Sequence, residues 1–187
     1  SLDSIVSIEL VDYNTYFDYT DKRATTEGVG PVKIGAKISE MPDSCYIYCY
    51  KEEIPVNQSD MTVCEFSDKT HTTIITAIGD GKGKIKSIEV EKLPIKLGGK
   101  VANTHTFVRD AVEKLKDAAE WSYDPESQNA IASFEGGKVT ISFGSQVFNE
   151  SGWAKYQQLQ KGAKGVKFDF NDFNDYDTFE TYTINAK

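Results

Sequence analysis

The clearest pattern of apolar and polar positions in this chain lies between residues 107 and 119. Apolar residues recur there at intervals of three and four, which places them on one side of a helix: Phe107, Val108, Ala111, Val112, Leu115, Ala118 and Ala119. Asn103, Thr104 and Thr106 precede this run and are candidate N-caps, because their side-chain oxygens accept backbone N–H groups. We therefore predict an amphipathic helix of about 14 residues that packs on a neighbouring element.

A hairpin follows this helix. Pro125 lies in the turn sequence at 124–127, where its fixed φ suits the second position of a turn. Residues 130–134 and 139–143 have strand composition, and Val139, Ile141 and Phe143 alternate with polar residues on the second of these strands. The turn between them contains two glycines at 136 and 137. The pattern predicts a small unit of one main helix packed on an antiparallel hairpin.

The first ninety residues have a different pattern, with short apolar segments and no helical periodicity. Strands are predicted at residues 5–11, 32–38, 44–50, 61–66, 72–78 and 84–90. The last two flank a glycine-rich hairpin loop at 79–83. Short strands at this spacing are typical of a β-sandwich. We predict an α+β, mainly β protein, with a sandwich over residues 1–92 and a second domain over residues 93–187.

The order of residues between 93 and 147 resembles a known module. Arg109 and Trp121 are twelve positions apart, and the pattern also includes Glu113, Leu115, Asp124 and the pair Gly144-Ser145. This order is similar to the N-terminal "stalk" domain of copper amine oxidases, a module that recurs in secreted and surface proteins of Gram-positive bacteria. The hairpin at 72–90 is similar to the closing hairpin of bacterial immunoglobulin-like surface domains. The resemblance implies a secreted, lipid-anchored or cell-surface protein, and it brings no catalytic residues.

Charge and composition narrow the range of partners. The 187 residues carry a formal net charge of −8, and 39% of them are hydrophobic. A negative chain does not suit nucleic acid, because phosphate contacts need clustered Lys and Arg. It is equally unsuited to anionic membrane surfaces. No apolar run approaches the length of a membrane span. These features are typical of a folded protein outside the nucleic-acid-binding and membrane-spanning classes.

The three cysteines allow two interpretations. Cys45 and Cys49 lie about 13 Å apart if their strand is straight, which is too far for a disulfide. Either of them can pair with Cys64 on a neighbouring strand. The odd count argues against a complete disulfide framework, so we favour three buried thiols. A zinc site is not expected, because Cys-x3-Cys on one strand does not converge on a metal.

Alternating tyrosines mark a candidate ligand-binding surface. Tyr46, Tyr48 and Tyr50 point to one side of the predicted strand at 44–50, opposite Cys45 and Cys49. Exposed aromatic rings stack well on sugars and apolar ligands. The alternative is an ordinary face of the sheet.

The C-terminal segment contains a candidate metal site. After a short predicted helix near 153–162, the most acidic stretch of the chain runs from 166 to 177. Its crowded oxygen ligands Asp169, Asn171, Asp172 and Asp175 are of the type that calcium prefers. The central Gly and terminal Glu of an EF-hand loop are missing. The alternative is an exposed loop or edge strand with its aromatic rings turned inward, followed by a last strand at 178–184.

Catalytic patterns are weak throughout. Neither His71 nor His105 lies in a nucleophile elbow, and the loop at 79–83 lacks the Lys-Ser/Thr pair of a phosphate-binding loop. We predict a non-enzymatic extracellular module that acts as a spacer or binds a cell-wall or surface polymer, or another surface protein. The alternatives are a hydrolase that uses two carboxylates on a surface polymer and a structural protein of a phage or secretion system.

Overall fold

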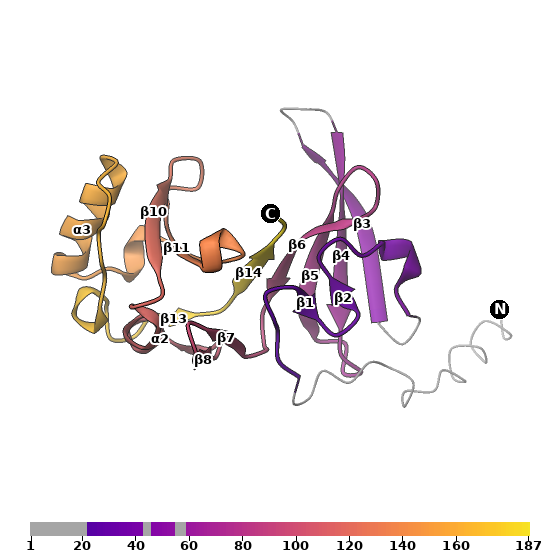
Figure 1. Ribbon diagram of the computed structural model, residues 1–187, viewed down its shortest axis with the longest axis horizontal. Coiled ribbons are helices and arrows are strands. Elements are labelled where there is room, and N and C mark those ends of the chain that lie inside the picture. Colours follow the sequence, from indigo (N-terminus) through magenta and orange to yellow (C-terminus); the bar gives the residue numbers. More distant parts are fainter. Residues whose placement is uncertain (1–21, 43–45, 55–58) are drawn as a thin grey trace, which may run out of the picture.

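The computed structural model describes residues 22–42, 46–54 and 59–187 (Figure 1). Its main feature is one antiparallel sheet of eight strands in the order β10-β11-β12-β14-β6-β5-β4-β3. Two helices accompany this sheet, α2 (Val108–Leu115) and α3 (Glu150–Gln160). The strands of the sheet are β3 (Tyr46–Ile54), β4 (Ser59–Ser67), β5 (Thr73–Gly79), β6 (Ile85–Val90), β10 (Glu120–Asp124), β11 (Asn129–Phe134), β12 (Val139–Phe143) and β14 (Tyr182–Asn185). The protein is therefore mainly β, as its sequence predicts.

The last strand joins the two halves of the chain. Ile184 of β14 lies opposite Val139 of β12 on one side and opposite Ile88 of β6 on the other, and Figure 1 shows β14 between the two groups of strands. The buried apolar side chains of both halves form one continuous core. The expectation that the second half packs as an independent unit is therefore wrong. The domain boundary near residue 92 itself stays a prediction.

An irregular layer covers the strands of the N-terminal half. It contains the two-residue strands β1 (Gly28–Val29) and β2 (Val32–Lys33) and a 3-10 turn at Ile38–Glu40. Val29 and Val32 are fully buried. The predicted strand at 32–38 is thus much shorter than expected. After β2 the backbone forms hydrogen bonds with Ile85 instead: Gly35 N donates to Ile85 O, and Ile85 N donates to Ala36 O. The strand predicted at 5–11 lies outside the described residues.

Short strands connect the two halves near α2. The hairpin of β7 (Ile95–Leu97) and β8 (Lys100–Ala102) is followed by β9 (Thr106–Phe107), which pairs with β13 (Thr178–Phe179). The sequence patterns do not predict β7, β8 or β9, since runs of two or three residues show no periodicity. β13 lies at the start of the strand predicted at 178–184.

Helix α2 is shorter than predicted and has no side-chain cap. It begins at Val108, whose N–H donates to the backbone oxygen of Asp177 at 2.9 Å. None of the three candidate N-caps holds the helix start, because the N-cap position is Phe107 and it makes no side-chain cap bond. A neighbouring chain segment therefore satisfies the orphan N–H group that a local cap would otherwise bind.

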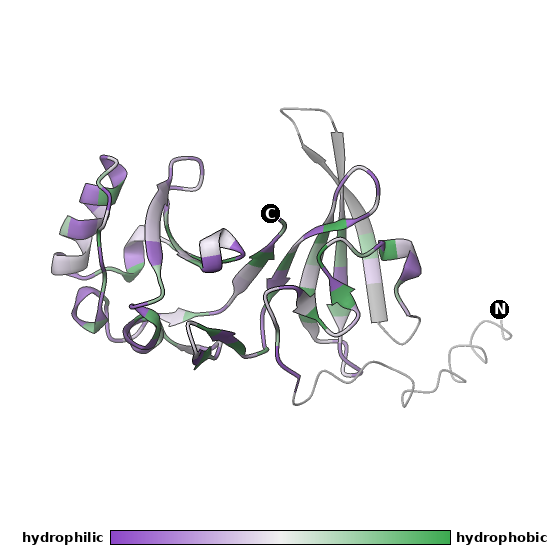
Figure 2. Cartoon of the chain, in the orientation of Figure 1, coloured by the Kyte–Doolittle hydropathy of each residue, from purple (hydrophilic) through white to green (hydrophobic). Residues whose placement is uncertain are grey.

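Helix α3 is capped within its own sequence. The side chain of Asn149 accepts a hydrogen bond from Gly152 N at 3.0 Å, which is typical N-cap geometry. Tyr156 and Leu159 are buried, whereas Trp153 is 44% exposed and stacks on Tyr156. Figure 2 shows apolar residues concentrated in the strands, with polar residues along much of α3.

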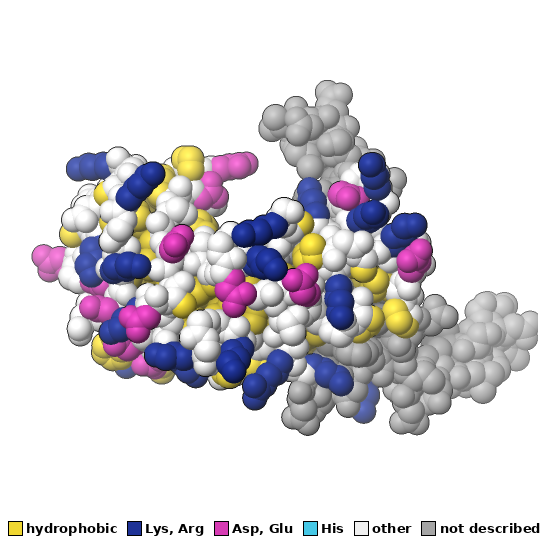
Figure 3. All heavy atoms as spheres, viewed as in Figure 1, with side chains coloured by type: hydrophobic (Ala, Val, Ile, Leu, Met, Phe, Trp, Pro, Cys, Tyr) yellow, Lys and Arg dark blue, Asp and Glu magenta, His cyan; other side chains and the backbone are white. Residues whose placement is uncertain are grey.

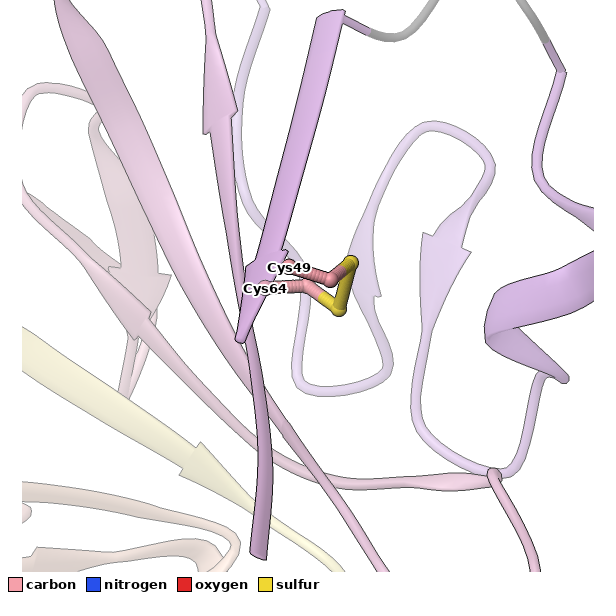
Figure 4. The surroundings of a disulfide bond; sticks show 2 residues. All are labelled: Cys49 and Cys64. Atoms are coloured by element: carbon pink, nitrogen blue, oxygen red, sulfur yellow. A yellow bond between two sulfur atoms is a disulfide. The ribbon is translucent and has the colours of Figure 1, made fainter. Parts of the chain in front are cut away.

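A disulfide joins the two strands at the end of the sheet. Cys49 of β3 and Cys64 of β4 are bonded, with their Cα atoms 4.1 Å apart (Figure 4). They lie directly opposite each other in the register of the two strands, so their side chains point to the same face of the sheet. The prediction that favoured free thiols is wrong for these two residues, because the sequence pattern does not give the register of neighbouring strands. Cys45 lies outside the described residues.

Candidate functional site

The predicted tyrosine surface lies on β3, the edge strand of the sheet. Tyr48 is 62% exposed. Tyr46 and Tyr50 occupy alternate backbone positions of the same strand. The tyrosine surface as a ligand-binding site stays a prediction.

The predicted calcium ligands mostly hold their own segment of the chain. Asp169 caps the 3-10 turn at Phe170–Asp172, and its Oδ1 accepts from Asn171 N at 2.9 Å. Asp175 and Asn171 are exposed. In residues 22–42, 46–54 and 59–187, no three His, Cys, Asp or Glu side chains are grouped as a metal site. The calcium site at these four residues stays a prediction.

Asp172 is the buried carboxylate of this segment. Its side chain is 2% exposed, and its two oxygens accept bonds from Ser151 Oγ at 2.5 Å, Lys155 Nζ at 2.7 Å and Asp169 N at 2.9 Å. Burial alone raises the pKa of this carboxyl, but the hydrogen bonds from Lys155 and Ser151 outweigh it and lower the pKa below its usual value. Asp172 therefore connects α3 to the C-terminal segment as an ionised group.

We expect Asp172→Asn to lower the free energy of unfolding by about 2 kcal/mol at pH 7. Because the folded pKa of Asp172 is lowered, its charge stabilises the fold above the unfolded value of about 3.9. That contribution disappears as the pH falls through the folded pKa. Urea denaturation at pH 7 and at successively lower pH checks this. If the free energies of unfolding of wild type and Asp172→Asn differed by the same amount at every pH, this prediction would be contradicted.

The two histidines do not form a catalytic or metal-binding group. His105 and His71 both adopt positive φ angles, 60° and 62°, in turns of the chain. His105 Nδ1 contacts Glu180 Oε2 on the surface. This pair lies beside β9 and β13, and it links two loops.

Arg109 lies between two aromatic rings. Its guanidinium carbon is 4.8 Å from the ring centre of Phe170 and 5.7 Å from that of Phe107, within the range of cation–π attraction. Its Nε is buried and has no hydrogen-bond partner among the residues that the structure describes. Trp121, the other key residue of the resemblance, packs against Phe168 with ring centres 4.5 Å apart. Both residues thus make packing contacts.

An open groove runs along β10, and we call it the β10 groove. It has a volume of about 710 Å³, within the 300–1,000 Å³ range of ligand sites. Four consecutive strand residues, from Glu120 to Tyr123, form one wall together with Pro125. The opposite wall comprises Leu159 and Gln160 from the end of α3, and residues 162–167 after it.

The two walls of this groove differ in chemistry. On the β10 side, Trp121 and Tyr123 present aromatic surface and Ser122 and Glu120 present polar groups. On the other side, Lys164 and Lys167 are both exposed. Gln160 Nε2 donates to the hydroxyl of Tyr123 at 3.4 Å, which ties the walls together at one point. Such a mixture of rings, lysines and polar groups suits binding.

The sequence analysis missed this groove. A signal for β10 was present, since Trp121 and Tyr123 alternate with polar residues in a strand-like manner. Lysines also recur at every third position in the segment 161–167. Nothing in the sequence indicates that this segment lies beside β10, because the two are far apart in the chain.

A polar row crosses one face of the whole sheet. Residues that lie directly opposite one another on successive strands form it: Glu120, Ser133, Thr140, Thr183, Glu89, Thr76, Glu65 and Tyr48. Glu65 and Glu89 lie two strands apart, about 10 Å between backbones. Burial raises the pKa of Glu89, and the charge of Glu91 adds to this effect. Figure 3 shows acidic and basic side chains interspersed over the visible surface.

Comparison with known proteins yields no relative. No protein-family model matches the chain, and no curated protein and no solved structure matches it. Across the described part of the chain, neither helix has the length and apolar character needed to cross a bilayer.

Proposed function

We propose that this chain is a non-enzymatic extracellular module of a bacterial secreted, lipid-anchored or cell-surface protein. It binds a cell-wall or surface polymer, or another surface protein, in the β10 groove. The observation that carries the proposal is the groove itself, in which aromatic rings and a lysine-bearing wall face each other across an open volume. Aromatic surface with a few polar groups is the usual chemistry of a binding site.

The disulfide supports the extracellular part of this proposal. Disulfides such as that between Cys49 and Cys64 persist in oxidising compartments and are rare in the cytosol. The resemblance of Arg109, Trp121 and the following hairpin to surface stalk modules stays part of this proposal. The immunoglobulin-like character of residues 1–92 belongs to the same proposal.

The shared sheet supports a spacer role beside binding. Because β14 pairs with strands of both halves, the two halves cannot separate without breaking ladder bonds. A continuous sheet suits a rigid element that holds a binding site away from an anchor. The exposed Tyr48, at the far edge of the sheet, is a second contact point in this proposal.

A groove-filling variant tests the binding site. We expect Ala163→Trp to weaken co-sedimentation with Gram-positive cell walls about tenfold, which corresponds to about 1.4 kcal/mol. Ala163 is exposed and lines the groove, so an indole ring fills the ligand volume without removing a core contact. Wild type and variant are compared by their bound fractions over a range of wall concentrations.

The matched control is Ala154→Trp, an equally exposed alanine of α3 that does not line the groove. Its binding should equal that of the wild type. Untreated and protease-treated walls distinguish a protein partner from a polymer. The proposal would be overturned if the wild-type protein sedimented with neither wall preparation. It would also be overturned if Ala163→Trp and Ala154→Trp weakened binding to the walls equally.

A hydrolase acting on the same polymers is the second candidate. The observation that favours it is the pair Glu65 and Glu89 on one face of the sheet, because glycosidases use two carboxyl groups and the raised pKa of Glu89 suits a general acid. Its two members stand on the same face of the sheet, two strands apart. Reducing ends released from walls during the sedimentation assay would favour this candidate over the first.

A further inference from the structure

Strand β10 has hydrogen-bonding groups on one free side. It is the terminal strand of the eight-stranded sheet and, among the described strands, pairs with β11 alone. In an antiparallel pair, alternate residues point their N–H and C=O groups away from the partner strand. No backbone bond outside the ladder reaches residues 120–123 from any other described segment. An edge of this kind is a template for another extended chain.

The β10 groove lies along this free edge. Successive side chains of a strand point to opposite faces, so four consecutive residues line one groove only if it follows the edge of the strand. The five residues of β10 extend for about 17 Å, enough for a peptide of about five residues. In the opposite wall, Gly162 and Gly165 adopt positive φ angles of 86° and 73°.

The charged residues of the opposite wall are all lysines, although the protein as a whole is acidic. Between Glu150 and Asp169 the sequence contains four lysines and no acidic residue. Lys164 and Lys167 of this segment line the groove. Lys167 Nζ donates to the backbone oxygen of Ala119 at 3.3 Å, and no ion pair engages Lys164 within the part of the chain that the structure describes. An occupant with carboxylates therefore complements this wall, whereas a basic one does not.

We propose that the β10 groove takes an extended acidic peptide, which pairs with the free edge of β10 as a ninth strand and directs its carboxylates toward Lys164 and Lys167. This mode of binding rests on the proposed function, and it selects a protein partner over a polymer. Main-chain bonds to β10 supply affinity, and the lysine wall supplies the preference for acidic side chains. Trp121 and Tyr123 form the apolar floor under the added strand.

Three capped seven-residue peptides test the mode of binding. The first alternates Val and Glu, the second alternates Val and Lys, and the third repeats the first with N-methylated backbone positions. We expect only the first to bind and to slow hydrogen exchange of the amides of residues 120–124. Equal binding of the N-methylated peptide, or no change in exchange along β10, would overturn the proposal.

A pair of charge reversals tests the lysine wall. Lys164→Glu should weaken binding of the acidic peptide about fivefold at low salt, because Lys164 lines the groove. Lys161→Glu makes the same charge change three residues earlier at a position outside the lining and should alter binding less than twofold. If Lys164→Glu and Lys161→Glu weakened binding of the acidic peptide equally, the lysines that line the groove would have no specific role in binding it.

The sedimentation assay separates this inference from the proposed function. Binding to protease-treated walls, without binding of the acidic peptide, would overturn the peptide proposal and leave the binding module intact. Failure of every peptide and of both wall preparations would overturn both proposals.

Discussion

Replacing Ile184 with alanine is expected to lower the free energy of unfolding by about 3–4 kcal/mol. Ile184 is fully buried in the strand that lies between β12 and β6. Removing its side chain opens a cavity in the core that both halves share. The cost of such a deletion is high, since surrounding strands relax only partly.

The same variant tests whether the halves unfold together. We expect urea transitions followed by tryptophan fluorescence, which reports residues 121 and 153, to coincide with those from hydrogen exchange in β5 and β6. Thr183→Ala, on the opposite face of β14 and half-buried, is the matched control and should cost less than about 1 kcal/mol. Two separated unfolding transitions, of which Ile184→Ala affects only one, would show that the two halves are independent domains.

Replacing Gly152 with alanine is expected to destabilise the protein by about 3 kcal/mol. A Cβ atom at this position would lie 1.9 Å from the backbone oxygen of Asp172. The obstacle is main chain, held in place by the bonds of Asp172 to Ser151 and Lys155, so it cannot rotate away. In an unobstructed helix the same substitution stabilises by up to about 1 kcal/mol, which makes the sign of the effect diagnostic.

Gly81→Ala is the control for this prediction. Nothing lies within 4 Å of a Cβ built at Gly81, and its φ angle is not positive. Its free energy of unfolding should stay within about 0.5 kcal/mol of the wild type. Thermal or urea denaturation of the wild type, Gly152→Ala and Gly81→Ala measures these differences in the free energy of unfolding. A Gly152→Ala protein as stable as wild type would show that α3 and the segment near Asp172 are not in such close contact.

Local patterns predicted most of the regular elements. The strands at 72–78, 84–90, 130–134 and 139–143 are present as β5, β6, β11 and β12, because strict alternation and turn residues act over a few positions. The helix at 107–119 is present in its first eight residues from Val108. The prediction of its N-cap residues was wrong, because the backbone oxygen of Asp177, which is distant in the chain, accepts the hydrogen bond of Val108 N.

The candidate sites were less predictable than the elements. Acidic residues near 169–177 suggested calcium ligands, and the structure uses Asp172 and Asp169 to hold α3 and a turn. The disulfide between Cys49 and Cys64 depends on strand register, which an isolated sequence pattern leaves open. The β10 groove depends on the segment after α3 lying beside the free edge of β10.

The sequence by itself determined that this protein is mainly β, acidic, and built around an amphipathic helix with a following hairpin, since these properties depend on composition and short-range periodicity. Only the tertiary structure decided that the C-terminal strand joins both halves into one sheet, that two cysteines meet, and that a lysine-bearing segment faces the edge of β10. These are contacts between residues far apart in the chain. Their formation depends on packing over the whole core, which no local pattern of apolar and polar positions specifies.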